Sequence, residues 1–116
     1  MARWRSYNKY GNKKCIYQGI VFDSKKECDH FIYLQYLEKA GEITDLQRQV
    51  RFELQPSFNH NGKTIRAINY VADFTFKDKD GLMHIQDVKG SQATMTEVYK
   101  LKKKMMQFKG YEIEEV

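Results

Sequence analysis

The sequence lacks several features that would indicate particular classes of protein. Its 116 residues include only two cysteines, Cys15 and Cys28, and these form no CxxC pair. The three histidines are scattered, so no zinc-ligand spacing is present either. We therefore expect both cysteines to be reduced thiols.

Long apolar runs are also missing. No stretch approaches the roughly 18 apolar residues that predict a membrane span. The first five residues lead into polar sequence rather than into the apolar stretch of a signal peptide. Because 41% of the residues are hydrophobic and 14% aromatic, the composition is globular. The length predicts one domain over residues 1–116, which we expect in the cytosol without a membrane partner.

Acidic residues are absent before Asp23, although the chain has a net charge of +5. Residues 1–14 form a basic N-terminal arm in which cations alternate with aromatic rings, a mixture suited to phosphate contacts and base stacking. The alternative is a tail that only improves solubility. The candidate DNA-binding residues here are Arg3, Trp4, Arg5, Lys13 and Lys14.

Turn residues and periodicity predict the elements of the first half. Residues 14–22 are extended and turn at Gln18-Gly19, and residues 24–40 form a helix that Gly41 ends. A strand over residues 47–54 follows. Residues 58–63 are expected to be a turn or flexible loop.

The second half predicts a hairpin, a helix and a strand. The spans 65–76 and 82–89 are rich in β-branched and aromatic residues, and Asp80-Gly81 is a hairpin turn signal. Thr94-Met95-Thr96-Glu97 is a capping-box pattern that opens a helix. Its apolar stripe is Val98, Leu101, Met105 and Phe108, and a closing strand spans residues 111–116. The order predicts an α/β domain with a mixed central sheet flanked by helices.

The hairpin brings two carboxylates together. A three-residue turn over residues 79–81 places Asp73 opposite Asp87, whereas a turn one residue longer places it opposite Gln86. Directly opposed like charges destabilise a sheet, so a cation between them is expected. Lys89 is two positions from Asp87 and therefore points to the same face.

Such a constellation suits metal-dependent phosphodiester hydrolysis. Two carboxylates can hold Mg²⁺, or Mn²⁺ in its place, while leaving positions for water and a phosphate oxygen. The ion would activate the water, and Lys89 would orient it or stabilise the transition state. The plainer interpretation is that Asp73 ends a strand while Asp87 and Lys89 are solvated. Asp73 lies inside an apolar run, however, where aspartate is depleted from strands.

Several stretches together resemble the PD-(D/E)xK nuclease superfamily, and within it a small phage-encoded family similar to Holliday-junction resolvases. They are Tyr10-Gly11-Asn12-Lys13-Lys14, Phe22-Asp23-Ser24-Lys25-Lys26-Glu27, Ala40-Gly41-Glu42-Ile43, Tyr70-Val71-Ala72-Asp73-Phe74 and Asp87-Val88-Lys89-Gly90. The resemblance implies a restriction-endonuclease-like core of one helix, a three-stranded meander, a second helix and a further strand. It also implies that the catalytic residues are Asp73, Asp87, Lys89 and Glu27. One departure is that Ala72, not proline, precedes Asp73.

Glu27 has two interpretations. Ser24 and Glu27 have the spacing of a capping box, in which Glu27 would reach back to its own helix start. If Asp23 is the cap instead, Glu27 lies on the inward side of the helix and is free to bind metal or position water. A buried carboxylate there requires a partner.

A second basic set on the predicted second helix begins near the proposed site. We expect Ser91 and Thr94 to shape the loop beside the phosphate, and Arg66, Lys100 and Lys103 to contact the DNA backbone. Lysines on a helix are otherwise simply its solvated face.

The function we expect is a Mg²⁺-dependent endodeoxyribonuclease of phage recombination or replication that cuts branched DNA. Symmetric cutting of a junction requires two sites, so a homodimer is expected, with the aromatic-rich first helix as its candidate interface. The alternatives are a DNA-binding or packaging accessory protein without turnover, and a general or end-acting nuclease.

Overall fold

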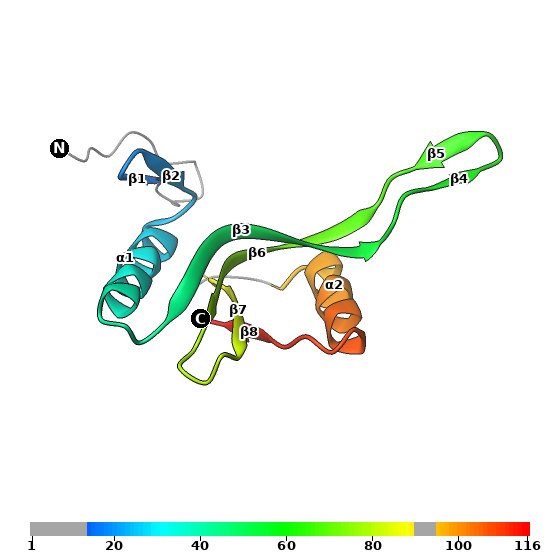
Figure 1. Cartoon of the computed structure of the whole chain (residues 1–116). Coiled ribbons are helices and arrows are strands. Elements are labelled where there is room, and N and C mark those ends of the chain that lie inside the picture. The colour runs from blue at the N-terminus through cyan, green and yellow to red at the C-terminus, as the bar shows by residue number, and fades with distance from the viewer. Residues whose placement is uncertain (1–13, 90–94) are drawn as a thin grey trace.

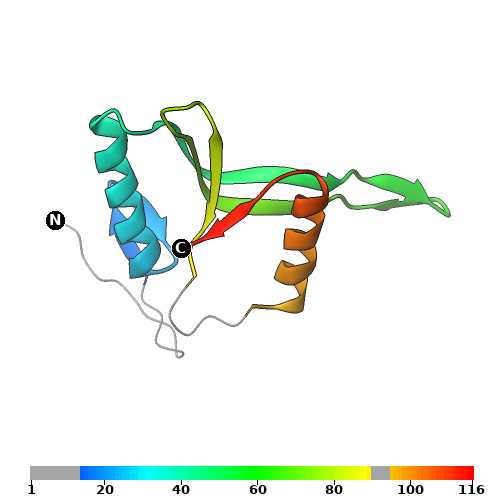
Figure 2. The same cartoon turned by 90° about the horizontal axis from the view of Figure 1, so that it is seen from below.

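The computed structural model describes residues 14–89 and 95–116 of the chain. A four-stranded sheet in the order β3-β6-β7-β8 is its centre, with β8 parallel to β7 and the other pairs antiparallel. Two helices flank this sheet (Figure 1, Figure 2), which confirms the expected mixed α/β class. The elements are β1 (Cys15–Tyr17), β2 (Ile20–Phe22), α1 (Lys25–Lys39), β3 (Thr44–Gln55), β4 (Phe58–His60), β5 (Lys63–Ile65), β6 (Ile68–Lys77), β7 (Met83–Asp87), α2 (Glu97–Phe108) and β8 (Ile113–Glu115).

The ends of α1 follow the expected signals. Ser24 is the N-cap, and its hydroxyl accepts a hydrogen bond from the Glu27 backbone N–H at 3.1 Å. Gly41 follows the helix with φ +79°, a left-handed conformation that glycine adopts readily. The helix is therefore set locally, and its register fixes which side Glu27 occupies.

The β6–β7 turn holds the central hairpin in one register. The Asp78 N–H donates to the Leu82 carbonyl at 2.9 Å, which encloses a three-residue loop with Gly81 at φ +83°. The Asp78 carboxylate accepts hydrogen bonds from the backbone N–H groups of Asp80 and Leu82. The paired residues of the ladder run from Lys77 opposite Met83 to Phe74 opposite Gln86. This is the first of the two expected registers.

Two hydrophobic clusters share strand β6. Phe74 and Phe76 pack in the cluster beneath α1, together with Phe22, Phe31 and Leu34. Tyr70 and Ala72 belong to the other cluster, which contains Met106 of α2 and Ile113 of β8. Asp73 lies at the point where β6 passes from one cluster to the other.

Residues 58–63 are not a flexible loop. Strands β4 and β5 pair as a hairpin around Asn61-Gly62, whose φ values are +51° and +78°. The expected strand over residues 65–76 is accordingly two strands, interrupted at residues 66–67, and β3 begins earlier than expected, at Thr44. An Asn-Gly pair favours a two-residue hairpin turn, so the signal was present in the sequence.

Helix α2 differs from its expected start and its expected face. Thr96 is the N-cap, and its hydroxyl accepts a hydrogen bond from the Tyr99 N–H. The helix therefore begins at Glu97, the last residue of the capping-box pattern. Val98, Leu101 and Phe108 are exposed, with Phe108 at 92%. Of the expected stripe, Met105 packs against the core, where it joins Met106 and Tyr99. Lys102 and Lys103 are half-buried on α2, which an apolar pattern does not anticipate.

Two expectations from composition concern the described residues directly. None of the helices over residues 14–89 and 95–116 is long and apolar enough to span a membrane. Both cysteines are free thiols, and Cys28 is buried with its Sγ 3.2 Å from that of Cys15.

Two phenylalanines test the location of the core. Phe74→Ala should reduce the free energy of unfolding by about 3–5 kcal/mol, because Phe74 is fully buried and its ring stacks on Phe31. Phe108→Ala should change it by less than about 0.5 kcal/mol, because that side chain is solvated. Urea denaturation followed by circular dichroism measures both. Equal losses would mean that α2 packs through the stripe expected from the sequence.

Candidate functional site

The hairpin places the two aspartates across from each other. One step beyond the Phe74–Gln86 pair, the register puts Asp73 opposite Asp87. Asp73 accepts a hydrogen bond from the Val88 N–H at 2.8 Å, and its carboxyl group lies within hydrogen-bonding reach of Asp87. Of the two arrangements that the sequence allowed, the structure has the one in which the carboxylates face each other directly.

Burial makes this carboxylate pair electrostatically unfavourable. The pKa of Asp73 rises to about 6, chiefly because the group is buried and further because Asp87 repels its charge. The Val88 N–H and the Lys89 ammonium act in the opposite direction. The single Lys89 ammonium balances only one of the two negative charges, so the pair favours the uptake of a proton or of a further cation.

Glu27 adds a third carboxylate on the α1 side. Its side chain is only 7% exposed, and its pKa rises to about 7 because of burial first and repulsion from Asp73 next. Ser24, not Asp23, is the N-cap, so the cap is the one that the capping-box interpretation required. Within the described residues, however, no hydrogen bond joins the Glu27 carboxylate to the Ser24 N–H. The Glu27 carboxylate lies close enough to Asp73 and Asp87 for their negative charges to raise its pKa.

Lys89 is held between a carboxylate and an aromatic ring. Its Nζ lies 3.4 Å from Asp87 Oδ1 and 3.4 Å from the centroid of the Tyr99 ring. The Lys89 side chain is 24% exposed and that of Asp87 14%. The Lys89 backbone carbonyl accepts a hydrogen bond from the Lys26 ammonium of α1. The lysine is thus fixed on the side of the pair where it was expected.

Four supporting residues were missed by sequence reasoning. The Tyr70 hydroxyl donates to Asp87 Oδ2 at 2.9 Å, and the Tyr99 hydroxyl donates to Glu115 Oε2 at 2.6 Å. Glu115 of β8 is paired in register with Asp87. Arg48 lies over the Phe22 ring and lowers the pKa of Glu27. Only Tyr70 lies near a motif in the sequence, so no local pattern marked the other three.

The expected DNA-binding residues divide into three groups. Lys14, Lys100 and Lys103 have acidic partners, namely Asp23, Glu97 and Glu115 at 3.2, 3.4 and 3.0 Å. Arg66 is exposed in the link between β5 and β6. Those outside the described residues are Arg3, Trp4, Arg5, Lys13, Ser91 and Thr94. Lys100 and Lys103 of α2 therefore balance nearby acids, and Lys103 in particular lies beside the site.

The aspartate pair fits a hard divalent cation by its chemistry. Across residues 14–89 and 95–116, no three His, Cys, Asp or Glu side chains are grouped so that they could hold a metal ion. Asp73 and Asp87 nevertheless supply two carboxylates, and Mg²⁺ takes one or two with water completing its shell. The raised pKa of Asp73 also indicates a deficit of positive charge that a cation would supply.

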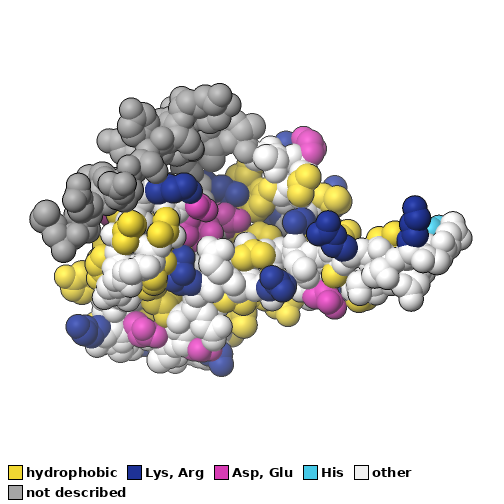
Figure 3. All heavy atoms as spheres, turned by 90° about the horizontal axis from the view of Figure 1, so that it is seen from above, with side chains coloured by type: hydrophobic (Ala, Val, Ile, Leu, Met, Phe, Trp, Pro, Cys, Tyr) yellow, Lys and Arg dark blue, Asp and Glu magenta, His cyan; other side chains and the backbone are white. Residues whose placement is uncertain are grey.

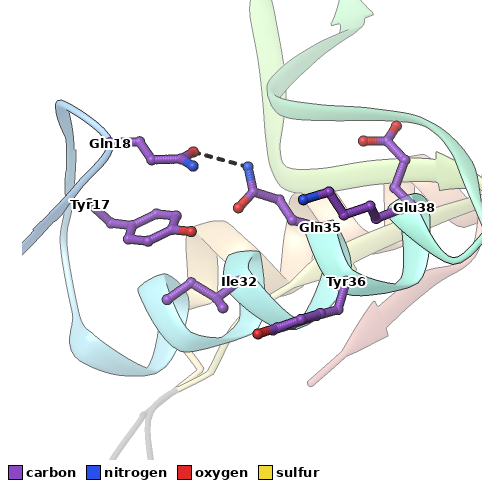
Figure 4. Close-up of a pocket in the computed structure, with 7 residues that line it drawn as sticks. Tyr17, Gln18, Ile32, Gln35, Tyr36 and Glu38 are labelled. Carbon is purple, nitrogen blue, oxygen red and sulfur yellow. Dashed lines mark hydrogen bonds between the residues drawn. The ribbon is translucent and has the colours of Figure 1, made fainter.

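A groove of about 480 Å³ lies elsewhere, between the β1–β2 turn and α1. Figure 4 shows Tyr17 and Gln18 facing Ile32, Gln35 and Tyr36 across it, with the Gln35 amide donating to Gln18 Oε1 at 3.1 Å. It contains neither Asp73 nor Asp87. The groove therefore does not coincide with the carboxylate site.

Protonation of the site should govern stability in metal-free buffer. Folding raises the pKa of Asp73 from 3.8 to about 6 and of Glu27 from 4.5 to about 7, so stability present below pH 4 is lost as the pH rises through 6 to 7. Between pH 5 and pH 8 the wild type should lose about 1.4 kcal/mol more than Asp73→Asn, because the folded-state pKa of about 6 lies one unit above pH 5 and one pKa unit corresponds to about 1.4 kcal/mol.

Urea denaturation in EDTA at the two pH values measures this difference. Asp29→Asn, which removes an exposed carboxylate of α1, should follow the wild type. The titration of His84, whose pKa is raised chiefly by its hydrogen bond to Asp78, is present in every variant and cancels. Equal losses in wild type and Asp73→Asn would contradict the proposed charge repulsion.

Comparison with known proteins places the chain in a family. Neither the curated proteins nor the solved structures contain a significant match. Residues 7–115 match the family described as "Protein of unknown function (DUF1064)". Because this match covers nearly the whole chain, the protein belongs to the DUF1064 family.

Proposed function

We propose that the protein is a Mg²⁺-dependent endodeoxyribonuclease that cuts branched DNA. The observation that carries the proposal is the half-buried Asp73–Asp87 pair with the Lys89 ammonium 3.4 Å from Asp87. An ordinary hairpin would avoid two opposed carboxylates, because they destabilise the sheet. The resemblance of the same segments to PD-(D/E)xK nucleases supports this assignment.

Each residue has a distinct part in the proposed reaction. Asp73 and Asp87 would hold the cation, and Glu27, which is not grouped with them as a third ligand, would orient a water. When bound, the cation would make water a stronger nucleophile and balance charge on the phosphate. Lys89 would stabilise the negative charge of the transition state, since Asp87 and the Tyr99 ring hold its ammonium in place. Tyr70 would keep Asp87 oriented through its hydrogen bond.

A cleavage assay with four substrates tests the proposal. A four-way junction, a flap, a plain duplex and a single strand are incubated with Mg²⁺ or with EDTA and separated on a denaturing gel. We expect cleavage of the branched substrates in Mg²⁺ alone. Binding without cleavage in Mg²⁺ or Mn²⁺ would instead indicate an accessory DNA-binding protein, and equal cutting of all four would indicate a general nuclease.

Single substitutions test the assigned residues. Asp87→Asn and Lys89→Ala should each reduce the cleavage rate by about 100-fold or more, because they remove groups that act on the transition state. Both should still bind DNA. Lys79→Ala, which removes an exposed cation paired with Glu42, should cleave like the wild type. More than about a tenth of wild-type cleavage by Asp87→Asn would tell against the assignment.

We also propose a homodimer, because symmetric cutting of a junction requires two sites and each chain has one. Helix α1 offers a surface for it: Phe31 is used in the core, but Tyr33 and Tyr36 are 56% and 71% exposed.

Light scattering at micromolar concentration should give twice the monomer mass, and Tyr33→Glu with Tyr36→Glu should halve it. Paired nicks on opposite strands of a junction should be lost in that variant. A monomeric wild type would exclude this arrangement.

A further inference from the structure

The β4–β5 hairpin projects from the body of the protein. It continues the line of β3 and β6 beyond the central sheet (Figure 1, Figure 2), and every residue of β4 and β5 is exposed. Six residues separate the end of β3 from the tip, so the projecting hairpin reaches about 20 Å at roughly 3.3 Å per residue. In the described residues neither strand pairs with the central sheet.

The charged side chains of the projecting hairpin are all cationic. The sequence contains no acidic residue from Leu54 to Ala72, whereas it carries Lys63, Arg66 and a histidine at position 60. In Figure 3 the projecting hairpin displays dark blue and cyan side chains towards its tip, and magenta only near its base. An isolated basic ribbon of this kind has electrostatic complementarity with a phosphate backbone.

The two faces of the ribbon differ. Pairing places Asn59 opposite Thr64, and the Thr64 hydroxyl donates to Asn59 Oδ1 at 3.1 Å. This leaves both amide hydrogens of Asn59 available on a polar face. Phe58 and Ile65 form a second pair, on the opposite face, and Lys63 pairs with His60 beside the turn. Asparagine and threonine are side chains that contact base edges, and lysine contacts phosphates.

We propose that the projecting hairpin inserts into the major groove of duplex DNA, with Lys63 and Arg66 contacting phosphates and Asn59 facing base edges. The major groove is about 12 Å wide and admits a two-stranded β-ribbon. The partner is thus a duplex arm of the DNA substrate. This inference rests on the DNA substrate of the proposed function, but not on the cleavage step.

DNA binding measured in EDTA tests the contact of the hairpin separately from the cleavage step. The affinity of the wild type for a fluorescent duplex is determined by anisotropy over a salt series, alongside two double variants with the same charge change. Lys63→Gln with Arg66→Gln should weaken binding by roughly 10-fold to 30-fold, and should lower the slope of log affinity against log salt by about 1.8. Lys39→Gln with Lys79→Gln, on other exposed parts of the chain, should lower neither.

Displacement of methyl green, a ligand of the major groove, tests the position of the ribbon. The wild type should displace the dye from duplex DNA, and the Lys63→Gln, Arg66→Gln variant should require a higher concentration. Binding without displacement would overturn the proposal. So would an unchanged salt slope, or a change in sedimenting mass that made the hairpin a contact between copies of the chain. A protein that cleaves DNA with an unchanged slope would retain the proposed function and lose only this inference.

Discussion

The register of the β6–β7 hairpin determines where the charged groups of the candidate site lie. The Asp78 carboxylate accepts two backbone N–H groups of the turn and also contacts His84 Nε2 at 2.8 Å, which fixes the loop at three residues. A slip of one residue would exchange the two faces of β7, because side chains alternate along a strand. Asp87 and Lys89 would then leave Asp73 and Tyr70. The chemistry of the site depends on a turn that begins five residues after Asp73.

The site occupies the boundary between the two hydrophobic clusters. Phe74 belongs to the α1 cluster and Ala72 to the α2 cluster. Asp73 lies between them in β6 and belongs to neither cluster. This boundary lets a carboxylate be shielded from water without lying inside either core. The raised pKa values of Asp73 and Glu27 are the electrostatic consequence. Such a local conflict with stable packing is what a functional site produces in an otherwise consistent fold.

The sequence predicted what is decided locally. Gly41 and the Asp-Gly turn, which set the end of α1 and the central hairpin, occur as expected, and Ser24 is one of the two N-caps that the sequence allowed. Most of the predicted buried face of α2 was wrong, because the buried face depends on which side the sheet can cover and not on the apolar spacing within the helix. Tyr99 and Glu115 were missed for a related reason. They reach Lys89 and Asp87 only through the docking of α2 and the parallel pairing of β8, which are long-range contacts.

Strand β6 joins the carboxylate pair to the proposed DNA contact at Arg66, which lies in the link between β5 and β6. Arg66 precedes Asp73 by seven residues, a span of about 23 Å along an extended strand. At 3.4 Å per base pair this corresponds to about seven base pairs of duplex. Because β6 is paired on both sides at Phe74 and Thr75, the strand is held in place next to the site. A duplex arm held at Arg66 would then present a phosphate to Asp73 at a fixed distance, so the hairpin would act as a ruler from the bound duplex to the point of cleavage.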